Sequence, residues 1–345
     1  MMTAVQTRRL DPIPLTPSPG GASAPATVAP RTRQLDVSVI GARGFIGSHV
    51  ARALAQRGHT VHTFDRSCPA MGPQGVDERI LTSDHVVWAA SSINPMIAEH
   101  DPDRVALDID AFTSFLGLLA QAPSRPRMVL LSSGGTVYDQ SVEPPYAESS
   151  PVGPDSAYGQ AKLLLEQELV RTAPGSIVLR VANAYGPGQP VAPGQGVISH
   201  WLHATAAGQP LHVFGDLRAA RDYVHVDDVA DAVVRAVEVT DPAHDVLNVG
   251  SGRPTSLGAL LDVIRDVVGP DAVEVRHHPV REFDGRSTWL DCTASELTLG
   301  WVAGTSLHDG IRQTWTSVTA DPIASAGGDA PGAPLRSAPT LGGAS

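Results

Sequence analysis

The chain has 345 residues, of which 42% are hydrophobic, so it can bury one large core or two smaller ones. Asp and Glu outnumber Lys and Arg by 36 to 25, and this net charge of −11 excludes a basic nucleic-acid surface. Only Cys68 and Cys292 are present, neither in a cluster with metal-ligand spacing, so we expect no disulfide framework, no metal site and a cytoplasmic location.

Both ends of the chain have the composition of disordered tails. Residues 1–33 and 319–345 are rich in Pro, Ala, Gly, Ser and Thr and lack hydrophobic periodicity, so they cannot bury enough surface to offset their ordering entropy. The N-terminal stretch has no apolar signal-peptide core, and no run reaches the roughly 18 apolar residues of a membrane span. We expect no membrane association.

Between these tails, short apolar strands alternate with amphipathic helices. The pattern predicts strands at 35–40, 60–64, 86–90, 127–133 and 176–181, with helices over 45–57, 102–121 and 157–172. This alternation predicts a doubly wound parallel sheet, the Rossmann fold, over 34–182. A smaller mixed lobe over 183–318, interleaved with the first domain, would bind substrate. Only about 20 residues separate Phe64 from Val86, so one βα unit is expected to be abbreviated there.

A glycine-rich turn follows the first predicted strand. Gly41, Gly44 and Gly47 stand where a strand meets a helix, which lets the backbone turn tightly and approach a pyrophosphate at the helix N-terminus. Asp65 ends the second strand, at the distance along the chain expected of a carboxylate that binds the adenosine ribose. This favours NAD, although the neighbouring Arg66 leaves NADP possible.

A Tyr-x-x-x-Lys pair supplies candidate acid–base chemistry. Tyr158 and Lys162 lie one turn apart on a predicted helix, and a nearby ammonium favours the phenolate of a tyrosine. Lys162 is the only lysine in the chain, all other basic residues being arginine. Its retention indicates a role that a planar guanidinium cannot fill.

Six ordered motifs together resemble the extended short-chain dehydrogenase/reductases of the nucleotide-sugar epimerase/dehydratase family. They are the Gly41 turn, LLSSGGTVY at 130–138, the Tyr158/Lys162 pair, LRVANAYGPG at 179–188, RDYVHVDDVA at 221–230 and LNVGSG at 247–252. The likeness covers roughly 35–316. It implies a nicotinamide cofactor that exchanges a hydride with a sugar carbon while the tyrosine moves the proton of the adjacent hydroxyl.

The resemblance also implies the remaining site residues. Beside the three glycines, the cofactor would contact Arg43, Phe45, Ile46, Ala89 and Ala90. The nucleotide sugar would contact Asn183 and the turn that follows it, with Arg221 and Arg281 holding the diphosphate, since arginine pairs bidentately with phosphate oxygens. A homodimer formed through the helix that bears Tyr158 and the helix before it is a further expectation from the resemblance.

Gly134 departs from the family pattern. It occupies the position where relatives carry a catalytic Ser or Thr, so the third catalytic hydroxyl is assigned to Ser133 or Thr136 and the choice stays open. The same glycine, with Gly135, disfavours a 4,6-dehydratase, which would need an acidic pair there.

Three hypotheses follow. The first is an NAD-dependent epimerase, acting at C4 of a nucleotide-linked hexose and favoured by Asp65. The second is an NAD(P)H-dependent ketoreductase of a nucleotide-linked 4-keto-6-deoxyhexose, for which Arg66 leaves room. The third is a dinucleotide-binding protein without catalysis, which Gly134 favours and Lys162 opposes.

Overall fold

The computed structural model describes residues 33–122, 125–242, 245–279 and 287–320. The predicted tails lie outside these ranges, except for Arg33 and for Thr319 and Ala320, through which the last helix continues past the expected start of the C-terminal tail.

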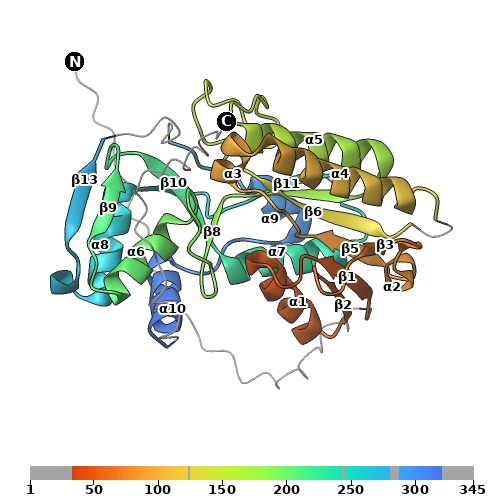
Figure 1. The fold of residues 1–345 in the computed structure, drawn as a ribbon, viewed down its shortest axis with the longest axis horizontal. Helices are drawn as coiled ribbons and strands as arrows, with labels where there is room; N and C mark the ends of the chain where they lie inside the picture. The colour runs from red at the N-terminus through yellow and green to blue at the C-terminus, as the bar shows by residue number, and fades with distance from the viewer. Residues whose placement is uncertain (1–32, 123–124, 243–244, 280–286, 321–345) are drawn as a thin grey trace, which may run out of the picture. The chain divides into compact units, whose positions relative to one another are not determined.

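A six-stranded parallel sheet forms the centre of the described chain (Figure 1). Its strand order is β11-β7-β6-β5-β1-β2, which confirms the predicted doubly wound α/β class. The bounds are β1 (Asp36–Ile40), β2 (Thr60–Phe64), β5 (His85–Trp88), β6 (Arg127–Ser133), β7 (Ile177–Val181) and β11 (Val246–Val249).

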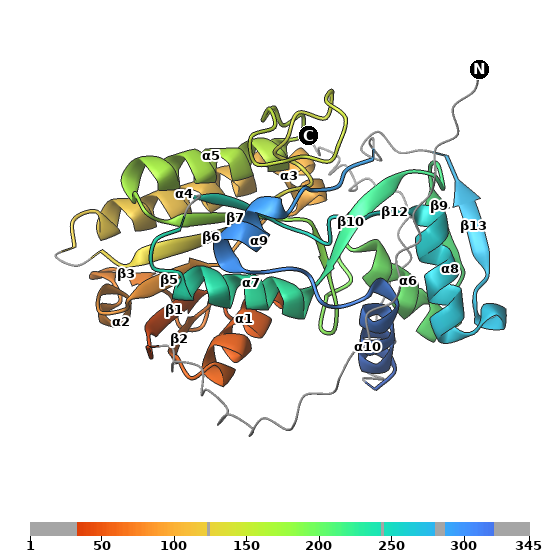
Figure 2. The same cartoon turned by 180° about the vertical axis from the view of Figure 1, so that it is seen from behind.

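Helices cover both faces of this sheet, as the two opposite views show (Figures 1 and 2). On one face lie α3 (Pro95–His100), α4 (Pro102–Leu119) and α5 (Ala157–Thr172), and the other face is covered by α1 (Phe45–Gln56), α7 (Val226–Glu238) and α9 (Thr293–Leu299). Each face has its own buried cluster. Phe112, Phe115 and Leu165 belong to the first, and Val50 and Val233 to the second. Strands buried on both faces explain the nearly continuous apolar runs in the sequence.

The βα unit after β2 is abbreviated, as predicted. Only a two-stranded hairpin, β3 (Met71–Gly72) with β4 (Gly75–Val76), and the four-residue α2 (Glu78–Leu81) separate β2 from β5. No further strand of the described chain pairs outside β2, so β2 is an edge of the sheet.

The chain beyond Val181 contributes to both parts of the molecule. It returns α7 and β11 to the central sheet and builds a smaller lobe from a three-stranded and a two-stranded sheet. The lobe contains β8 (Asn183–Tyr185), α6 (Val197–Ala206), β9 (Leu211–Phe214), β10 (Ala220–His225), β12 (Pro254–Ser256), α8 (Leu257–Val268), the 3₁₀ turn η1 (Pro270–Ala272), β13 (Val275–His278) and α10 (Leu307–Ala320).

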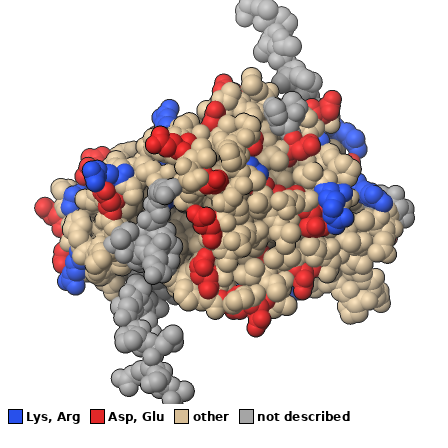
Figure 3. Space-filling model, turned by 90° about the horizontal axis from the view of Figure 1, so that it is seen from above, with Lys and Arg blue, Asp and Glu red and all other residues tan. Residues whose placement is uncertain are grey.

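The surface fits the acidic composition. On the face seen in Figure 3, acidic side chains form several patches and basic ones are scattered, with no continuous basic stripe. Among the described residues, no helix has the length and apolarity needed to cross a membrane, and no three His, Cys, Asp or Glu side chains gather to hold a metal ion.

Candidate active site

The glycine-rich turn packs too closely for side chains. Gly41 has a φ of +88°, and a Cβ built there would lie 2.6 Å from the backbone nitrogen of Ala90 at the end of β5. A Cβ at Gly47 would lie 2.1 Å from the carbonyl oxygen of Gly41. No side chain caps the first amides of α1, so backbone N–H groups and the positive end of the helix dipole face this turn. These features fit a dinucleotide pyrophosphate.

Asp65 ends β2 beside this turn. Its Oδ1 accepts hydrogen bonds from the backbone and hydroxyl of Ser67, each at 2.6 Å, and its Oδ2 lies 2.8 Å from Nε of Arg43. The bonds from Ser67, with help from Arg43, hold the pKa of Asp65 below its usual range. Asp65 is therefore a carboxylate at neutral pH, with the guanidinium of Arg43 beside it, and Arg66 is the exposed next residue of the chain.

Tyr158 and Lys162 lie in the first two turns of α5. The ammonium of Lys162 is 5.5 Å from the centre of the Tyr158 ring, and Lys162 is only 4% exposed. Within the described ranges, Lys162 has no carboxylate within ion-pair distance. Tyr158 packs against a small apolar cluster that contains Ile93 and Ala98 from the segment after β5.

The loop after β6 comes into direct contact with the start of α5. A Cβ at Gly159 would lie 2.3 Å from the carbonyl oxygen of Thr136, so only glycine allows this approach. The hydroxyl of Thr136 is buried and has no hydrogen-bond partner in the described part of the chain, whereas Ser133 is partly exposed at the end of β6.

Leu290 explains the glycine at position 134. A Cβ at Gly134 would lie 2.6 Å from Cδ1 of Leu290 and 2.9 Å from the carbonyl oxygen of Arg180. The family's Ser or Thr therefore has no room here. Sequence patterns gave no sign of this, because Leu290 comes from a segment more than 150 residues away.

Two substrate-side candidates come together on neighbouring strands. Asn183 is opposite Tyr223 in the pairing of β8 with β10, and its Nδ2 donates to the carbonyl oxygen of Asp222 at 2.9 Å. Arg221 lies on β10, where its Nη1 donates to the carbonyl oxygen of Ala220. Asp222 itself is buried and accepts bonds from Ser251, Gly252 and Leu290. The remaining candidate, Arg281, lies outside the described residues.

Sequence reasoning missed the role of Asp108 on α4. Its carboxylate accepts hydrogen bonds from the hydroxyl of Ser91 and the backbone of Ser92, and so fixes the loop directly after Ala89 and Ala90. A carboxylate at position 108 has no partner on its own helix that sequence spacing could identify, because Ser91 and Ser92 lie about 16 residues earlier in the chain.

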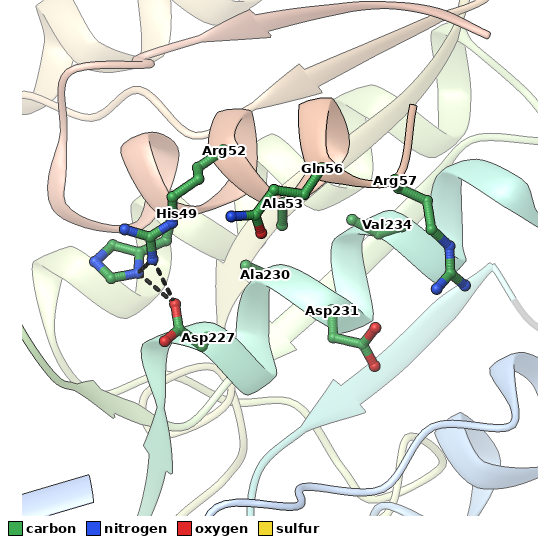
Figure 4. Close-up of a pocket in the computed structure, with 9 residues that line it drawn as sticks. All are labelled: His49, Arg52, Ala53, Gln56, Arg57, Asp227, Ala230, Asp231 and Val234. Atoms are coloured by element: carbon green, nitrogen blue, oxygen red, sulfur yellow. Dashed lines mark hydrogen bonds and ion pairs between the residues drawn. The ribbon is translucent and has the colours of Figure 1, made fainter. Parts of the chain in front are cut away.

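A separate hollow of about 730 Å³ lies between α1 and α7, away from Tyr158 and Lys162 (Figure 4). Charged side chains bridge it: His49 Nδ1 and Arg52 both contact Asp227, at 2.6 and 2.8 Å. His49 Nε2 also bonds the carbonyl oxygen of Pro187 in the turn after β8. The hollow thus links the helix after the glycine-rich turn to the smaller lobe, and its acidic and basic groups neutralise one another.

Comparison with known proteins identifies the family. Residues 37–250 match the model of the NAD dependent epimerase/dehydratase family. The chain belongs to this family. It is an NAD-dependent enzyme with a Rossmann fold.

Three similar proteins are matched over nearly their whole length. The chain is 32% identical to a UDP-glucose 4-epimerase of Mycolicibacterium smegmatis, over 80% of this chain and 96% of the relative. It is 28% identical to the dTDP-6-deoxy-L-talose 4-dehydrogenase (NAD(P)(+)) of Kitasatospora kifunensis, over 86% of this chain and 99% of the relative. Among solved structures, the UDP-glucose 4-epimerase of Thermotoga maritima with UDP-glucose superposes with a TM-score of 0.71 and is 29% identical. The match covers 81% of this chain and 97% of that structure's chain.

Proposed function

We propose that this enzyme is an epimerase acting at C4 of a nucleotide-linked hexose, with Tyr158 and Lys162 as its acid–base pair. The observation that carries the proposal is the buried ammonium of Lys162, which lies beside Tyr158 without a carboxylate partner among the described residues. The positive charge of this ammonium stabilises negative charge that develops on the Tyr158 oxygen during proton transfer. A phenolate can accept the proton of a sugar hydroxyl and return it later as a phenol.

The residues around this pair bind the cofactor and the substrate in this proposal. Gly41, Gly44 and Gly47, with the amides of Phe45 and Ile46, hold the pyrophosphate of the cofactor, and Asp65 binds its ribose, with Arg43, Ala89 and Ala90 lining the site. Bound NAD would supply the hydride chemistry: it would accept the hydride of the sugar carbon, and after the resulting ketone had turned over it would return the hydride to the opposite face, which inverts that carbon. Thr136 is our choice for the third hydroxyl, because its Oγ is buried next to α5 and has no hydrogen-bond partner among the described residues. Ser133 then serves substrate binding.

The substrate proposal rests on the smaller lobe and on the relatives. Asn183 and Arg221 lie on paired strands beyond β7, with Arg281 as a further candidate for the diphosphate. Two of the three relatives above are named UDP-glucose 4-epimerases, one of them solved with UDP-glucose. We infer that a nucleoside-diphosphate sugar lies between these residues and Tyr158.

Reduction of a nucleotide-linked 4-keto-6-deoxyhexose is the second candidate. It is favoured by Arg43, whose guanidinium is 77% exposed beside Asp65 and, with Arg66, could pair with the 2′-phosphate of NADP. The relative from Kitasatospora kifunensis is named for both cofactors.

We further propose a homodimer through α4 and α5. Leu107 and Leu118 on α4 and Leu164 and Val170 on α5 are exposed large apolar side chains, and burying them against a second copy would be favourable. Light scattering tests this proposal, and a monomer at assay concentration would contradict it. The cytoplasm is the proposed location, because neither described cysteine forms a disulfide.

The first experiment is to measure bound NAD in the purified protein, then to supply UDP- and dTDP-hexoses without added cofactor. Sugar interconversion without net cofactor use is expected. Tyr158→Phe should lower turnover by about 10²–10⁴-fold and leave the NAD content unchanged. An enzyme that instead consumes NADPH only with a keto-sugar would be the reductase, and full activity of Tyr158→Phe would refute both assignments.

A further inference from the structure

A buried ion pair lies directly behind Lys162. Glu166, one turn further along α5, is 3% exposed, and Arg180 on β7 is 5% exposed. Arg180 Nη2 donates to Oε2 of Glu166 at 2.7 Å, and its Nε lies 3.1 and 3.2 Å from the two carboxylate oxygens. Ser132 on β6 donates its hydroxyl to Oε1 at 2.5 Å. Both oxygens of Glu166 are therefore occupied.

Helix geometry alone would predict a different pairing. Residues four apart on a helix are neighbours, so Lys162 and Glu166 would ordinarily attract each other. Both are buried on the same side of α5, where the low dielectric strengthens that attraction. In the folded protein, Glu166 instead binds Arg180, and Lys162 has no ion-pair partner among the described residues.

We propose that Arg180 is a positioning residue: by holding both oxygens of Glu166, it keeps this carboxylate from neutralising Lys162. The proposal rests on the function proposed above for Tyr158 and Lys162. Arg180 does not touch the reacting atoms. It acts through Glu166 on the charge of Lys162 that Tyr158 experiences.

Other charges near Tyr158 are already engaged. From α3, Glu99 accepts a hydrogen bond from the backbone of Ala157, and from α4, Asp108 is bound by the serine loop after Ala90. Arg127, the charged residue of β6, lies at the opposite end of that strand. Glu166 is therefore the carboxylate best placed to pair with Lys162 if Arg180 is removed.

The test uses Arg180→Met in the full-length chain. Glu166 should turn to Lys162, and pairing of the Lys162 ammonium should move the measured midpoint upward by about one pH unit. Two readouts are needed: the pH dependence of turnover, and an ultraviolet difference titration of the phenolate with Tyr158→Phe as blank. The second needs no substrate, so it separates failure of this proposal from failure of the proposed function.

The double variant Glu166→Gln/Arg180→Met is the matched control. It lacks both charges, so Lys162 stays free and the midpoint should return to that of the wild type. Arg180→Lys, whose single ammonium cannot span both oxygens, should give a smaller shift in the same direction and serves if Arg180→Met fails to fold. Glu166→Gln alone should leave the midpoint unraised. An unshifted midpoint in the Arg180 variants, or an equal shift in the double variant, would overturn the proposal.

Discussion

Both ends of the six-stranded sheet carry ion pairs, such as Arg43 with Asp65 at the carboxyl end and Arg57 with Glu238 at the amino end, but the two ends differ in what surrounds these pairs. At the carboxyl ends of β1, β5 and β6 lie the closely packed backbone of Gly41 and Ala90 and the buried hydroxyl of Thr136, which has no hydrogen-bond partner in the described part of the chain. At the amino ends, charged side chains bind one another or the helices. Arg127, at the start of β6, donates to the carbonyl oxygens that end α7, those of Ala236 and Val239.

A second group of polar contacts lies at the amino end of the sheet. Arg57, just after α1, forms two hydrogen bonds with Glu238 of α7, and His59 bonds the same carboxylate and the backbone of Leu35. These contacts join α1 and α7 across the amino end of the sheet. In open α/β sheets, ligands bind outside the carboxyl ends of the strands, and the residues that we propose for the cofactor lie at that end.

The largest effect is expected from Gly47→Ala, which changes the glycine-rich turn at the carboxyl end of the sheet. The new Cβ would lie 2.1 Å from the carbonyl oxygen of Gly41, and backbone cannot move aside without shifting α1. We expect NAD affinity to fall about 100-fold, the equivalent of about 3 kcal/mol of overpacking. Isothermal titration calorimetry measures the affinity for NAD.

The control for this prediction is Gly72→Ala in β3, where a Cβ would meet nothing within 4 Å. It should bind NAD like the wild type. Unchanged affinity in Gly47→Ala would mean that this turn does not hold the cofactor.

The carboxyl end of the sheet was also the part most accessible to sequence reasoning. Gly41, Gly47, Tyr158 and Lys162 are local signals, because short spacings along one strand, turn or helix determine where they lie. The strands and the abbreviated unit after β2 follow from hydrophobic periodicity in the same way.

Long-range packing was not predictable. That Leu290 fills the space beside Gly134, or that Arg180 rather than Lys162 binds Glu166, depends on residues brought together only by the tertiary fold. From sequence alone, Glu166 would have been paired with its helix neighbour. The choice between Ser133 and Thr136 likewise needed burial, which the alternation of side chains along β6 does not give.

A smaller effect is expected from Gly134→Ser, which restores the family's hydroxyl. Contacts with Leu290 and with the carbonyl oxygen of Arg180 should lower the free energy of unfolding by about 1–3 kcal/mol. Gly135→Ser is the matched control, since a Cβ there meets nothing within 4 Å. In urea titrations, Gly134→Ser combined with Leu290→Ala should cost less than the sum of the single changes. Simple additivity would show that Leu290 is not what excludes a side chain.

The smallest predicted effect is on the pH dependence of stability and concerns His85, at the amino end of the sheet. Burial, reinforced by the nearby charge of Arg127, lowers the pKa of His85 to about 4 from its usual 6.5. As pH falls below about 6.5, the unfolded chain therefore binds a proton that the folded chain does not, and stability is lost until pH reaches about 4. At about pH 5.5 this loss amounts to about 1 kcal/mol. His85→Gln should remove that part of the pH dependence in urea unfolding measured between about pH 7 and pH 5. His277→Gln, a change at an exposed position on β13, should leave it in place, and equal slopes for His85→Gln and the wild type would show that His85 is not held neutral by the fold.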